Sequence, residues 1–482
     1  MKLGKLIERI KPLKVVGKNI DEVEVASVCA DSRKVGEGAL FVATVGTAVD
    51  GHTFIAGCVE NGAVAIVCQE LPSDLSDKCT YVQVALSKKD ILSVFLDNIN
   101  VIGITGTNGK TTIATLLYKM FLYFGHKAGL LSTVCNYVNL EAVPSTHTTP
   151  DPISLQKLLA DMVEAGCEYA FMEVSSHSAD QKRIAGLQFD GGIFTNITRD
   201  HLDYHKTFDN YIKAKQSFFT SLSKNAFALT NADDKNGLVM TQCSKANVKT
   251  YSVRQIADYR AKIVCDSFEG MELEISNKSV FTQFVGRFNA SNLLAVYGAC
   301  RLLGKDEQET LVALSTMVPV NGRFEAITSP SGYVSIVDYA HTPDALMNVI
   351  STISEVKGGD SRLITIVGCG GNRDKGKRPI MAQEAVKASD IVMITSDNPR
   401  NEEPMDIIND MLAGLDAEQQ KSVMVNPDRE QAIKTVMMMV QKGDVVLVAG
   451  KGHEDYQETN GVRKHFLDRE EAELVLRELG WI

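Results

Sequence analysis

The sequence predicts an α/β protein built from three domains, and three observations support this prediction. The chain is 482 residues long, which is more than one hydrophobic core usually accommodates. From about residue 100 onward, short apolar runs alternate with stretches of helical periodicity, as in parallel sheets covered by helices. Many of these runs end in small or polar residues, and the ligand sites of parallel sheets lie at such strand ends.

Residues 1–92 form the first predicted domain, a small α/β unit. Apolar side chains recur at helical spacing among charges near its start, so an amphipathic helix is expected rather than a signal peptide. These apolar residues are Leu3, Leu6, Ile7 and Ile10. Strand-like runs follow at 39–46 and 63–69, and a turn is expected at 49–52.

Residues 93–325 form the second predicted domain, in which strands alternate with helices. A buried strand at 100–105 leads through a glycine-containing turn into a helix at 111–124. Three more strands of the same kind are expected at 169–174, 191–197 and 226–231.

Residues 326–482 form the third predicted domain, where a second alternating series begins. Its strands are expected at 333–340, 362–371, 390–400 and 444–452. The segment 318–327 separates the two series and is predicted to be the hinge between them.

The composition excludes several classes of protein. A net charge of −10 and a pI near 5.5 argue against a nucleic-acid-binding protein, because such proteins are usually basic. The ten cysteines are scattered without a C-x-x-C pair, so we expect free thiols in a reducing cytoplasm and neither structural zinc nor disulfides. No run of eighteen apolar residues occurs, so no membrane span is expected. We expect a soluble, cytoplasmic protein that acts as a monomer.

The stretch GITGTNGKTT, residues 103–112, is predicted to bind phosphate although its glycine spacing is unusual. The common pattern has a glycine five residues before the Gly-Lys pair, where this chain has Ile104. The loop still joins a strand to a helix, so backbone N–H groups, the helix N-terminus and Lys110 can surround a phosphate, and the Thr111 hydroxyl can bind Mg²⁺. The alternative is a glycine-rich turn that carries a surface lysine.

Later strand ends in the same region also carry polar side chains. Glu173 comes at the end of a predicted strand, where a carboxylate can hold a divalent ion beside Thr111. The stretch TRDHLDYH offers four candidate metal ligands, Asp200, His201, Asp203 and His205. The alternative for that stretch is a solvated helix start with an aspartate cap. Lys213 and Lys215 follow on a predicted helix, where an exposed lysine is the default.

Seven motifs in the second and third predicted domains resemble those of the Mur ligase family: TGTNGKTT, MEVSSH, TRDHLDYH, DYAHTPDAL, GCGGNRDKGKRP, SDNPR and GKGHEDYQ. They keep the family's order and span residues 105–457. The resemblance implies a central P-loop-type parallel-sheet domain, a C-terminal Rossmann-like domain and a smaller N-terminal α/β domain. A folylpolyglutamate synthetase shares this plan but not SDNPR and GKGHEDYQ, and a P-loop switch or motor has no need of them.

The resemblance also implies an activity in cytoplasmic peptidoglycan precursor synthesis. ATP phosphorylates the D-glutamate side-chain carboxylate of UDP-N-acetylmuramoyl-L-alanyl-D-glutamate, and the amine of meso-diaminopimelate then displaces phosphate from the acyl phosphate. ATP and Mg²⁺ are the implied cofactors, and Lys215 is implied to carry a carbamate. The implied roles are UDP-sugar binding for 1–92, ATP binding and ligation for 93–325, and amino-acid binding for 326–482.

Carried over position by position, the resemblance implies four groups of site residues. The implied catalytic residues are Lys110, Glu173, His201 and Lys215. The implied metal ligands are Thr111, Glu173, His201 and carbamylated Lys215. The implied ATP-binding residues are Gly106, Thr107, Asn108, Gly109, Lys110, Thr111, Thr112, Asn289, Asn292, Arg323, Asp338 and His341. The implied contacts to the UDP-linked dipeptide are Ala30, Ser32, Thr47, Ala48, Val49, His147, Thr148, Thr149, Ser175, Gln181 and Arg183, with His147 standing where the family often has asparagine.

The amino-acid pocket has a clear chemical requirement. The distal centre of diaminopimelate carries a carboxylate and an ammonium, so a selective pocket needs an arginine fork and an acid. The implied diaminopimelate-binding residues are Arg373, Asp397, Asn398, Pro399, Arg400, Gly450 and Glu454. For each segment alone, the alternative is a turn with surface charges.

Overall fold

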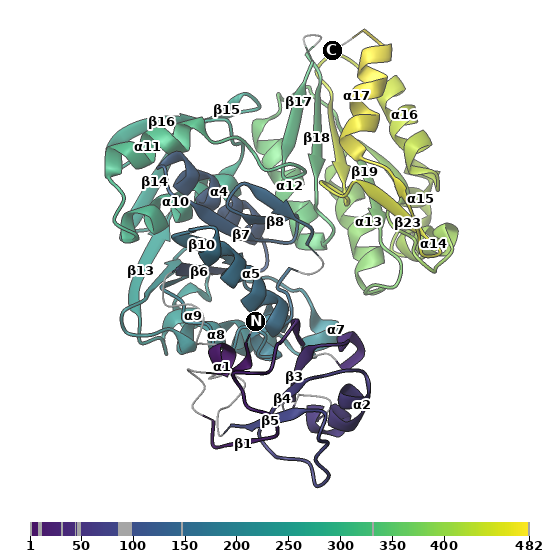
Figure 1. Ribbon diagram of the computed structural model, residues 1–482. Helices are drawn as coiled ribbons and strands as arrows, with labels where there is room; N and C mark the ends of the chain where they lie inside the picture. Colours follow the sequence, from purple (N-terminus) through teal and green to yellow (C-terminus); the bar gives the residue numbers. More distant parts are fainter. Residues whose placement is uncertain are drawn as a thin grey trace.

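The computed structural model describes residues 2–7, 12–29, 32–43, 45, 50–84, 99–145, 148–329 and 332–480. Three α/β units follow one another along the chain, each built on its own main sheet (Figure 1). The N-terminal unit lies at one end of the central unit, and the C-terminal unit packs against the other end of it. The predicted α/β class is confirmed.

The N-terminal sheet has five strands in the order β1-β5-β4-β3-β2. Strand β1 is antiparallel to β5, whereas the other pairs are parallel. The elements are α1 (Leu3–Ile7), β1 (Lys14–Val16), β2 (Ser27–Cys29), η1 (Ser32–Lys34), β3 (Ala39–Ala43), η2 (Gly51–Phe54), α2 (Ile55–Glu60), β4 (Ala65–Cys68) and β5 (Thr80–Gln83). Leu3 and Ile7 of the predicted amphipathic helix are buried, and Ile10 lies outside the described residues.

The central sheet has eleven strands in the order β16-β15-β14-β13-β12-β11-β6-β10-β7-β8-β9. The four strands expected from the sequence are neighbours and run parallel, so their carboxyl ends share one edge. They are β6 (Asn100–Thr105), β10 (Tyr169–Glu173), β11 (Gly191–Phe194) and β12 (Phe227–Asn231). Both ends of the sheet are extended by antiparallel strands, which were not expected. The remaining strands are β7 (Ala128–Leu131), β8 (Asn136–Val138), β9 (Glu141–Val143), β13 (Asn247–Ser252), β14 (Tyr259–Ser267), β15 (Gly270–Ile275) and β16 (Lys278–Thr282).

Helices cover both faces of the central sheet and bury two apolar clusters. Helices α4 (Lys110–Tyr123), α10 (Arg287–Leu302) and α11 (Glu307–Thr316) lie on one face, where their side chains form the larger cluster. Helices α5 (Pro152–Glu164) and α8 (Phe208–Ser221) contribute to the cluster on the other face. The short helices are α6 (Ser176–Asp180), α7 (Leu202–His205) and α9 (Gly237–Thr241).

The C-terminal sheet has six strands in the order β17-β18-β22-β19-β20-β21, and all but β17 are parallel. The strands are β17 (Glu325–Thr328), β18 (Val334–Asp338), β19 (Leu363–Cys369), β20 (Ile391–Ser396), β21 (Val423–Asn426) and β22 (Val445–Ala449). A separate hairpin consists of β23 (Tyr456–Thr459) and β24 (Val462–His465). The helices are α12 (Pro343–Val356), α13 (Lys377–Ala388), α14 (Pro404–Leu412), α15 (Ala417–Ser422), α16 (Arg429–Met439) and α17 (Asp468–Glu478).

The predicted hinge, residues 318–327, packs closely against the C-terminal sheet. The N–H of Tyr339 donates to the Gly322 carbonyl at 3.0 Å. A Cβ added to Gly322, where φ is +66°, would lie 2.1 Å from the backbone nitrogen of His453. Phe324 is buried in the same apolar cluster as Val285, which comes from the central unit. The connection therefore joins the two units through packed side chains.

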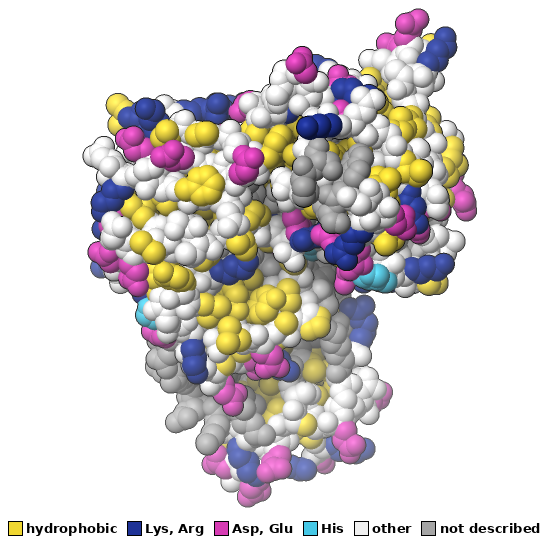
Figure 2. Space-filling view, turned by 90° about the horizontal axis from the view of Figure 1, so that it is seen from above, with side chains coloured by type: hydrophobic (Ala, Val, Ile, Leu, Met, Phe, Trp, Pro, Cys, Tyr) yellow, Lys and Arg dark blue, Asp and Glu magenta, His cyan; other side chains and the backbone are white. Residues whose placement is uncertain are grey.

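No helix within the described ranges is long and apolar enough to cross a membrane. On the face seen in Figure 2, Lys and Arg side chains are mixed with Asp and Glu side chains.

Candidate active site

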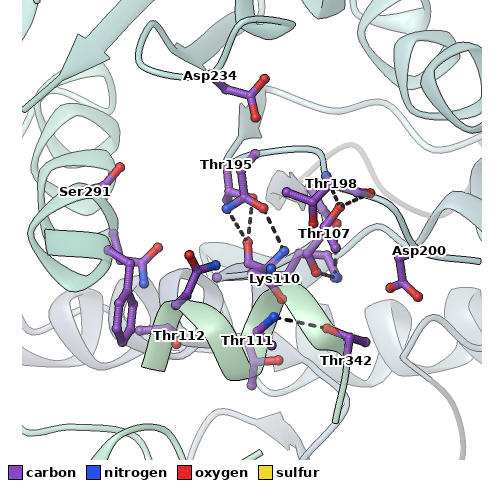
Figure 3. A pocket seen from close by; sticks show the side chains of 18 of the residues that line it. Thr107, Lys110, Thr111, Thr112, Thr195, Thr198, Asp200, Asp234, Ser291 and Thr342 are labelled. Atoms are coloured by element: carbon purple, nitrogen blue, oxygen red, sulfur yellow. Dashed lines mark hydrogen bonds between the residues drawn. The ribbon is translucent and has the colours of Figure 1, made fainter. Parts of the chain in front are cut away.

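A cavity of about 700 Å³ opens at the carboxyl ends of β6, β10, β11 and β12, and residues of the C-terminal unit line its other side. All residues of the stretch 106–112 line it, together with residues at the ends of β10, β11 and β12. Figure 3 shows Lys110, Asp200 and Asp234 around this cavity, with Thr342 contributed by the start of α12. The parallel topology thus gathers segments that are far apart in the sequence.

The stretch 106–112 has the conformation of a phosphate-binding loop. Gly106 and Gly109 adopt φ values of +151° and +85°, which favour glycine over other residues. A Cβ on Gly106 would lie 1.8 Å from Thr195 Oγ1. Thr195 Oγ1 also donates to the Asn108 carbonyl at 2.6 Å, and the Asn108 N–H donates to Asn196 Oδ1 at 2.9 Å. The unusual glycine spacing is thus accommodated by a loop that the end of β11 holds in place.

Lys110 begins helix α4 and points back over the loop. Its ammonium donates to the carbonyls of Gly106 at 3.1 Å and Thr107 at 2.8 Å. Burial lowers the pKa of Lys110, and Arg323 adds to the effect, while Glu173 and Asp200 oppose it. The N-cap residue of α4 is Gly109, which has no side chain to accept hydrogen bonds from the first turn of the helix. The N-terminus of α4 therefore lines the cavity without a capping side chain. This end of the helix carries partial positive charge.

Thr111 and Glu173 meet at the cavity wall. Thr111 Oγ1 donates to Glu173 Oε1 at 2.9 Å, and that oxygen also accepts from the Thr133 N–H at 2.8 Å. Arg323 donates to Thr111 Oγ1 at 3.3 Å. Two adjacent ligands of octahedral Mg²⁺ lie about 3 Å apart, because each Mg–O bond is about 2.1 Å. Oxygen type and separation therefore both fit Mg²⁺ between Thr111 and Glu173.

Lys215 is almost fully buried on α8, with 1% of its side chain exposed, so the default of an exposed lysine is wrong here. Its ammonium donates to the Gly106 carbonyl at 2.7 Å and lies 4.9 Å from the centre of the Tyr211 ring. Burial and the nearby charge of Lys110 hold the pKa of Lys215 well below its ordinary value. Lys213, two residues earlier, is exposed as expected.

His201 also lines the cavity, at a left-handed φ of +53°. Burial lowers its pKa to about 4, with Asp200 opposing the shift from 3.4 Å. A neutral imidazole and a neutral amine suit metal binding and CO₂ addition respectively. His205 points elsewhere, because its Nε2 lies 2.9 Å from Ser176 Oγ in the buried interior. Within the described residues, no three His, Cys, Asp or Glu come together as a metal site.

The remaining residues predicted to bind ATP come from α10 and the C-terminal unit. Asn292 lines the cavity, while Asn289 lies behind it and accepts from Asn292 Nδ2 at 3.3 Å. Asp338 accepts from the Phe324 N–H at 2.6 Å, and burial raises the pKa of Asp338 to about 6. His341 lines the cavity as well, with its pKa lowered to about 4 by burial.

The described residues among those predicted to bind the nucleotide sugar divide into three groups. Thr148 and Ser175 line the cavity. Arg183 donates to Gln181 Oε1 at 2.9 and 2.6 Å and to the Thr149 carbonyl at 3.1 Å, so these residues form a linked set beside it. Ser32 begins the short helix η1 of the N-terminal unit. Ala30, Thr47, Ala48, Val49 and His147 lie outside the described residues.

The residues predicted to bind diaminopimelate gather at a second place, the carboxyl edge of the C-terminal sheet. Asn398 is buried, and its Nδ2 donates to Glu454 Oε2 at 2.7 Å. A Cβ on Gly450 would lie 2.7 Å from Asp397 Oδ2, so glycine is needed for this approach. Burial and Asp397 raise the pKa of Glu454, and Lys451 opposes that shift from 3.3 Å.

The two predicted arginines approach this second place from neighbouring loops. Arg400 Nη1 donates to the Gly371 carbonyl at 2.9 Å, close to Gly370. The side chain of Arg373 also lies close to Gly370, and Arg373 is an exposed residue. The Pro399 carbonyl lies so close to Gly371 that a Cβ added there would be 1.9 Å from the carbonyl oxygen.

Two residues that shape the two places, Tyr339 and Lys451, were not predicted, whereas Asp200, predicted as a candidate metal ligand, does line the cavity. Tyr339 lines the same cavity and stacks its ring 4.6 Å from the Arg323 guanidinium. The Tyr339 hydroxyl lies 3.4 Å from Glu454 Oε1, so this side chain spans both places. Lys451 is fully buried between Asn398 and Glu454. Tyr339 and Lys451 both lie within the quoted motifs DYAHTPDAL and GKGHEDYQ, and these motifs were the sequence signal that could have identified them.

This fold and loop define a P-loop nucleotide-binding protein of the α/β class. Three domain models match the chain: "Mur ligase family, catalytic domain" at residues 24–94, "Mur ligase middle domain" at 104–300, and "Mur ligase, glutamate ligase domain" at 322–452. The chain belongs to the Mur ligase family.

Individual relatives match over nearly the full length. UDP-N-acetylmuramoyl-L-alanyl-D-glutamate–2,6-diaminopimelate ligase of Bacteroides fragilis is 58% identical over 99% of both chains. The enzyme of the same name from Parabacteroides distasonis is 59% identical over 98% of both chains. A solved structure of a ligase with this name has a TM-score of 0.69 at 30% identity, covering 100% of this chain and 99% of the other. The MurF ligase from Thermotoga maritima, solved with ADP, shares the fold at a TM-score of 0.63 and 21% identity, over 95% of this chain and 98% of that one.

Proposed function

We propose that this protein joins meso-diaminopimelate to UDP-N-acetylmuramoyl-L-alanyl-D-glutamate with hydrolysis of ATP to ADP and phosphate, in peptidoglycan precursor synthesis. One observation carries the proposal: relatives 50–59% identical over 98–99% of this chain share the corresponding ligase name. The two clusters described above support it, because one suits a triphosphate and the other a doubly charged amino acid.

The ATP phosphates bind in the loop 106–112, against the start of α4. Lys110 provides a cation that needs only to turn from the loop carbonyls toward a phosphate oxygen. Arg323 and Asn292 approach from the other side of the cavity and complete the nucleotide site. Phosphoryl transfer depends mainly on positioning and on neutralising charge, which these groups provide.

Thr111 and Glu173 would hold Mg²⁺, and His201 and the carbamate of Lys215 would hold a second metal ion. The metal supplies charge neutralisation for the transferring phosphoryl group. The protein's own contribution is to fix the ligands: Thr133 orients Glu173 through its N–H, and Asp200 lies beside His201. The low pKa of Lys215 leaves its amine available for CO₂, since only the neutral amine can form a carbamate.

The reaction proceeds in two steps. An oxygen of the D-glutamate side-chain carboxylate attacks the γ-phosphorus, the bond to ADP breaks, and an acyl phosphate forms. The neutral amine of diaminopimelate then attacks the acyl carbon, and inorganic phosphate leaves with the former carboxylate oxygen. The amine loses one proton, which passes to phosphate or solvent, and keeps the other as the amide N–H.

Each unit has a separate task in this proposal. Residues 1–92 bind the UDP-sugar end, residues 93–325 bind ATP and carry out ligation, and residues 326–482 bind the amino acid. Thr148, Ser175 and the Gln181–Arg183 pair hold the dipeptide portion beside the phosphate loop. The enzyme acts as a monomer in the cytoplasm, where its ten free cysteines stay reduced.

Selection of diaminopimelate rests on charge pairing at the second cluster. Arg400 pairs with the distal carboxylate, with Arg373 beside it, and Glu454 accepts the distal ammonium. Lysine lacks this carboxylate, so it leaves Arg400 unpaired.

A coupled assay of phosphate release tests the proposal. Release should require the UDP-linked dipeptide and diaminopimelate together, and lysine or glutamate should support little of it. Glutamate-dependent release with a folate substrate would instead indicate a folylpolyglutamate synthetase. Release that needs neither amino acid nor dipeptide would indicate a P-loop switch.

A further inference from the structure

The hairpin of β23 and β24 stands beside the amino-acid cluster, outside the residues that the family domain models match. The last of those models ends at residue 452, and the hairpin begins four residues later. Its turn, Asn460–Gly461, has φ values of +51° and +75°, as in a tight two-residue hairpin turn. It is therefore a compact unit added after the part of the chain that the family models cover.

The hairpin binds the segment 397–400 through four hydrogen bonds. Gln457 Nε2 donates to the Asp397 carbonyl at 2.8 Å, and the Glu458 N–H donates to Asn398 Oδ1 at 2.9 Å. The Arg400 N–H donates to the Glu458 carbonyl at 2.9 Å, and the Asn460 N–H donates to the Arg400 carbonyl at 2.6 Å. Arg400 thus pairs with β23 as a short third strand, in register with Thr459.

Arg400 needs this support, because its backbone is strained. Its φ is +52°, a left-handed value that residues other than glycine adopt only where the surroundings impose it. The backbone conformation sets where the side chain starts, and Arg400 Nη1 then reaches the Gly371 carbonyl. The two backbone hydrogen bonds between the hairpin and the Arg400 N–H and carbonyl help to hold the residue in this conformation.

The hairpin itself is stiffened on its outer strand. Arg463 of β24 stacks its guanidinium 4.2 Å from the Tyr456 ring and pairs with Glu458 at 3.1 Å. These contacts fix β23 at the residues that hold Asn398 and Arg400.

We propose that hairpin β23–β24 is a positioning element that sets amino-acid selectivity by holding Arg400 and Asn398 in their binding conformation. The inference rests on the function proposed above, in which Arg400 binds the distal carboxylate. It predicts that weakening the hairpin turn harms recognition of diaminopimelate and leaves the other two substrates alone.

The test variant is Gly461→Val. A Cβ at Gly461 meets no atom within 4 Å, so the substitution strains only the turn backbone. Gly304→Val is the matched control, because Gly304 has φ of +79°, also meets nothing within 4 Å, and ends α10 far from the hairpin. Gln457→Ala is a second variant. It removes the hydrogen bond to the Asp397 carbonyl and leaves the hairpin turn unchanged. Thermal unfolding of each variant verifies that the chain is folded.

For Gly461→Val we expect the KM for diaminopimelate to rise about tenfold, with KM values for ATP and the UDP-linked dipeptide changed less than about twofold. The preference for diaminopimelate over lysine should fall by a similar factor, and Gln457→Ala should shift it in the same direction. Gly304→Val should keep the parent's KM values. Equal changes in all three KM values, or an unchanged preference in both hairpin variants, would overturn the inference. A parent enzyme that does not use diaminopimelate would instead refute the proposed function.

Discussion

Replacing Lys215 should separate a role as a carbamate from a role as a cation. At neutral pH an ordinary lysine is neutral in only about four molecules in ten thousand, because its pKa is near 10.4. Burial and Lys110 lower the pKa of Lys215, and each unit of lowering raises the neutral fraction about tenfold. The site therefore favours the amine that reacts with CO₂.

The two informative variants are Lys215→Arg, which stays charged and cannot carry a carbamate, and Lys215→Met, which has no charge. Loss of one electrostatic stabiliser costs on the order of a hundredfold or more in kcat, or about 3 kcal/mol. Both variants should show that loss in the phosphate-release assay. Lys215→Ala should regain part of its activity with added short carboxylic acids, and the parent should lose activity in buffers depleted of CO₂ and regain it with bicarbonate.

Three outcomes would refute this reasoning. Substantial activity of Lys215→Arg would mean that a cation suffices. Near-parent activity of Lys215→Met would mean that the residue is structural. If active parent enzyme in ¹³C-labelled bicarbonate gives no carbamate resonance, Lys215 does not carry the modification.

Three further predictions concern other residues. Lys110→Met should lower kcat by about a hundredfold or more, because the transferring phosphoryl loses its nearest cation; near-normal kcat would contradict the ATP site. Arg400→Ala should lower kcat/KM for diaminopimelate at least about tenfold, equivalent to about 1.4 kcal/mol, and hardly affect lysine; equal losses would make Arg400 structural. Burial raises the pKa of Asp338 from 3.8 to about 6, so its stabilising contribution is complete below pH 3.8 and is lost as pH rises through about 6. Without nucleotide, denaturant titrations should therefore show the free energy of unfolding of the parent falling by about 2.4 kcal/mol more than that of Asp338→Asn between pH 4 and 8, and parallel curves would exclude this role.

Much of the fold could be predicted because the parallel strands are long apolar runs with marked ends. Strands β6, β10, β11 and β12 were all expected, and their adjacency follows from the rules for parallel sheets. The antiparallel strands β14 to β16 were missed although the run MELEI alternates as a half-exposed strand does. Sequence periodicity identifies such strands, but it does not say to which sheet edge they add.

The sequence predicted the site residues that lie in recognisable motifs. It did not predict features of the site that depend on how deeply a side chain is buried in the folded protein. Lys110, Thr111 and Glu173 were selected from their positions at strand ends, and the structure brings them together. The burial of Lys215 could not be inferred from spacing, because helical periodicity does not reveal which partner covers a face. Tyr339 joins the cavity beside the loop 106–112 to Glu454 through contacts across the fold, and no local pattern encodes such a contact.

Oxygen-isotope transfer tests the central claim most directly. The UDP-linked dipeptide is labelled with ¹⁸O in the D-glutamate side-chain carboxylate and incubated with enzyme, ATP and diaminopimelate. The account predicts that each amide bond formed is accompanied by one ¹⁸O atom in the released phosphate, and that neither appears when diaminopimelate is left out. Amide formation with unlabelled phosphate, or no amide formation with diaminopimelate, would contradict it.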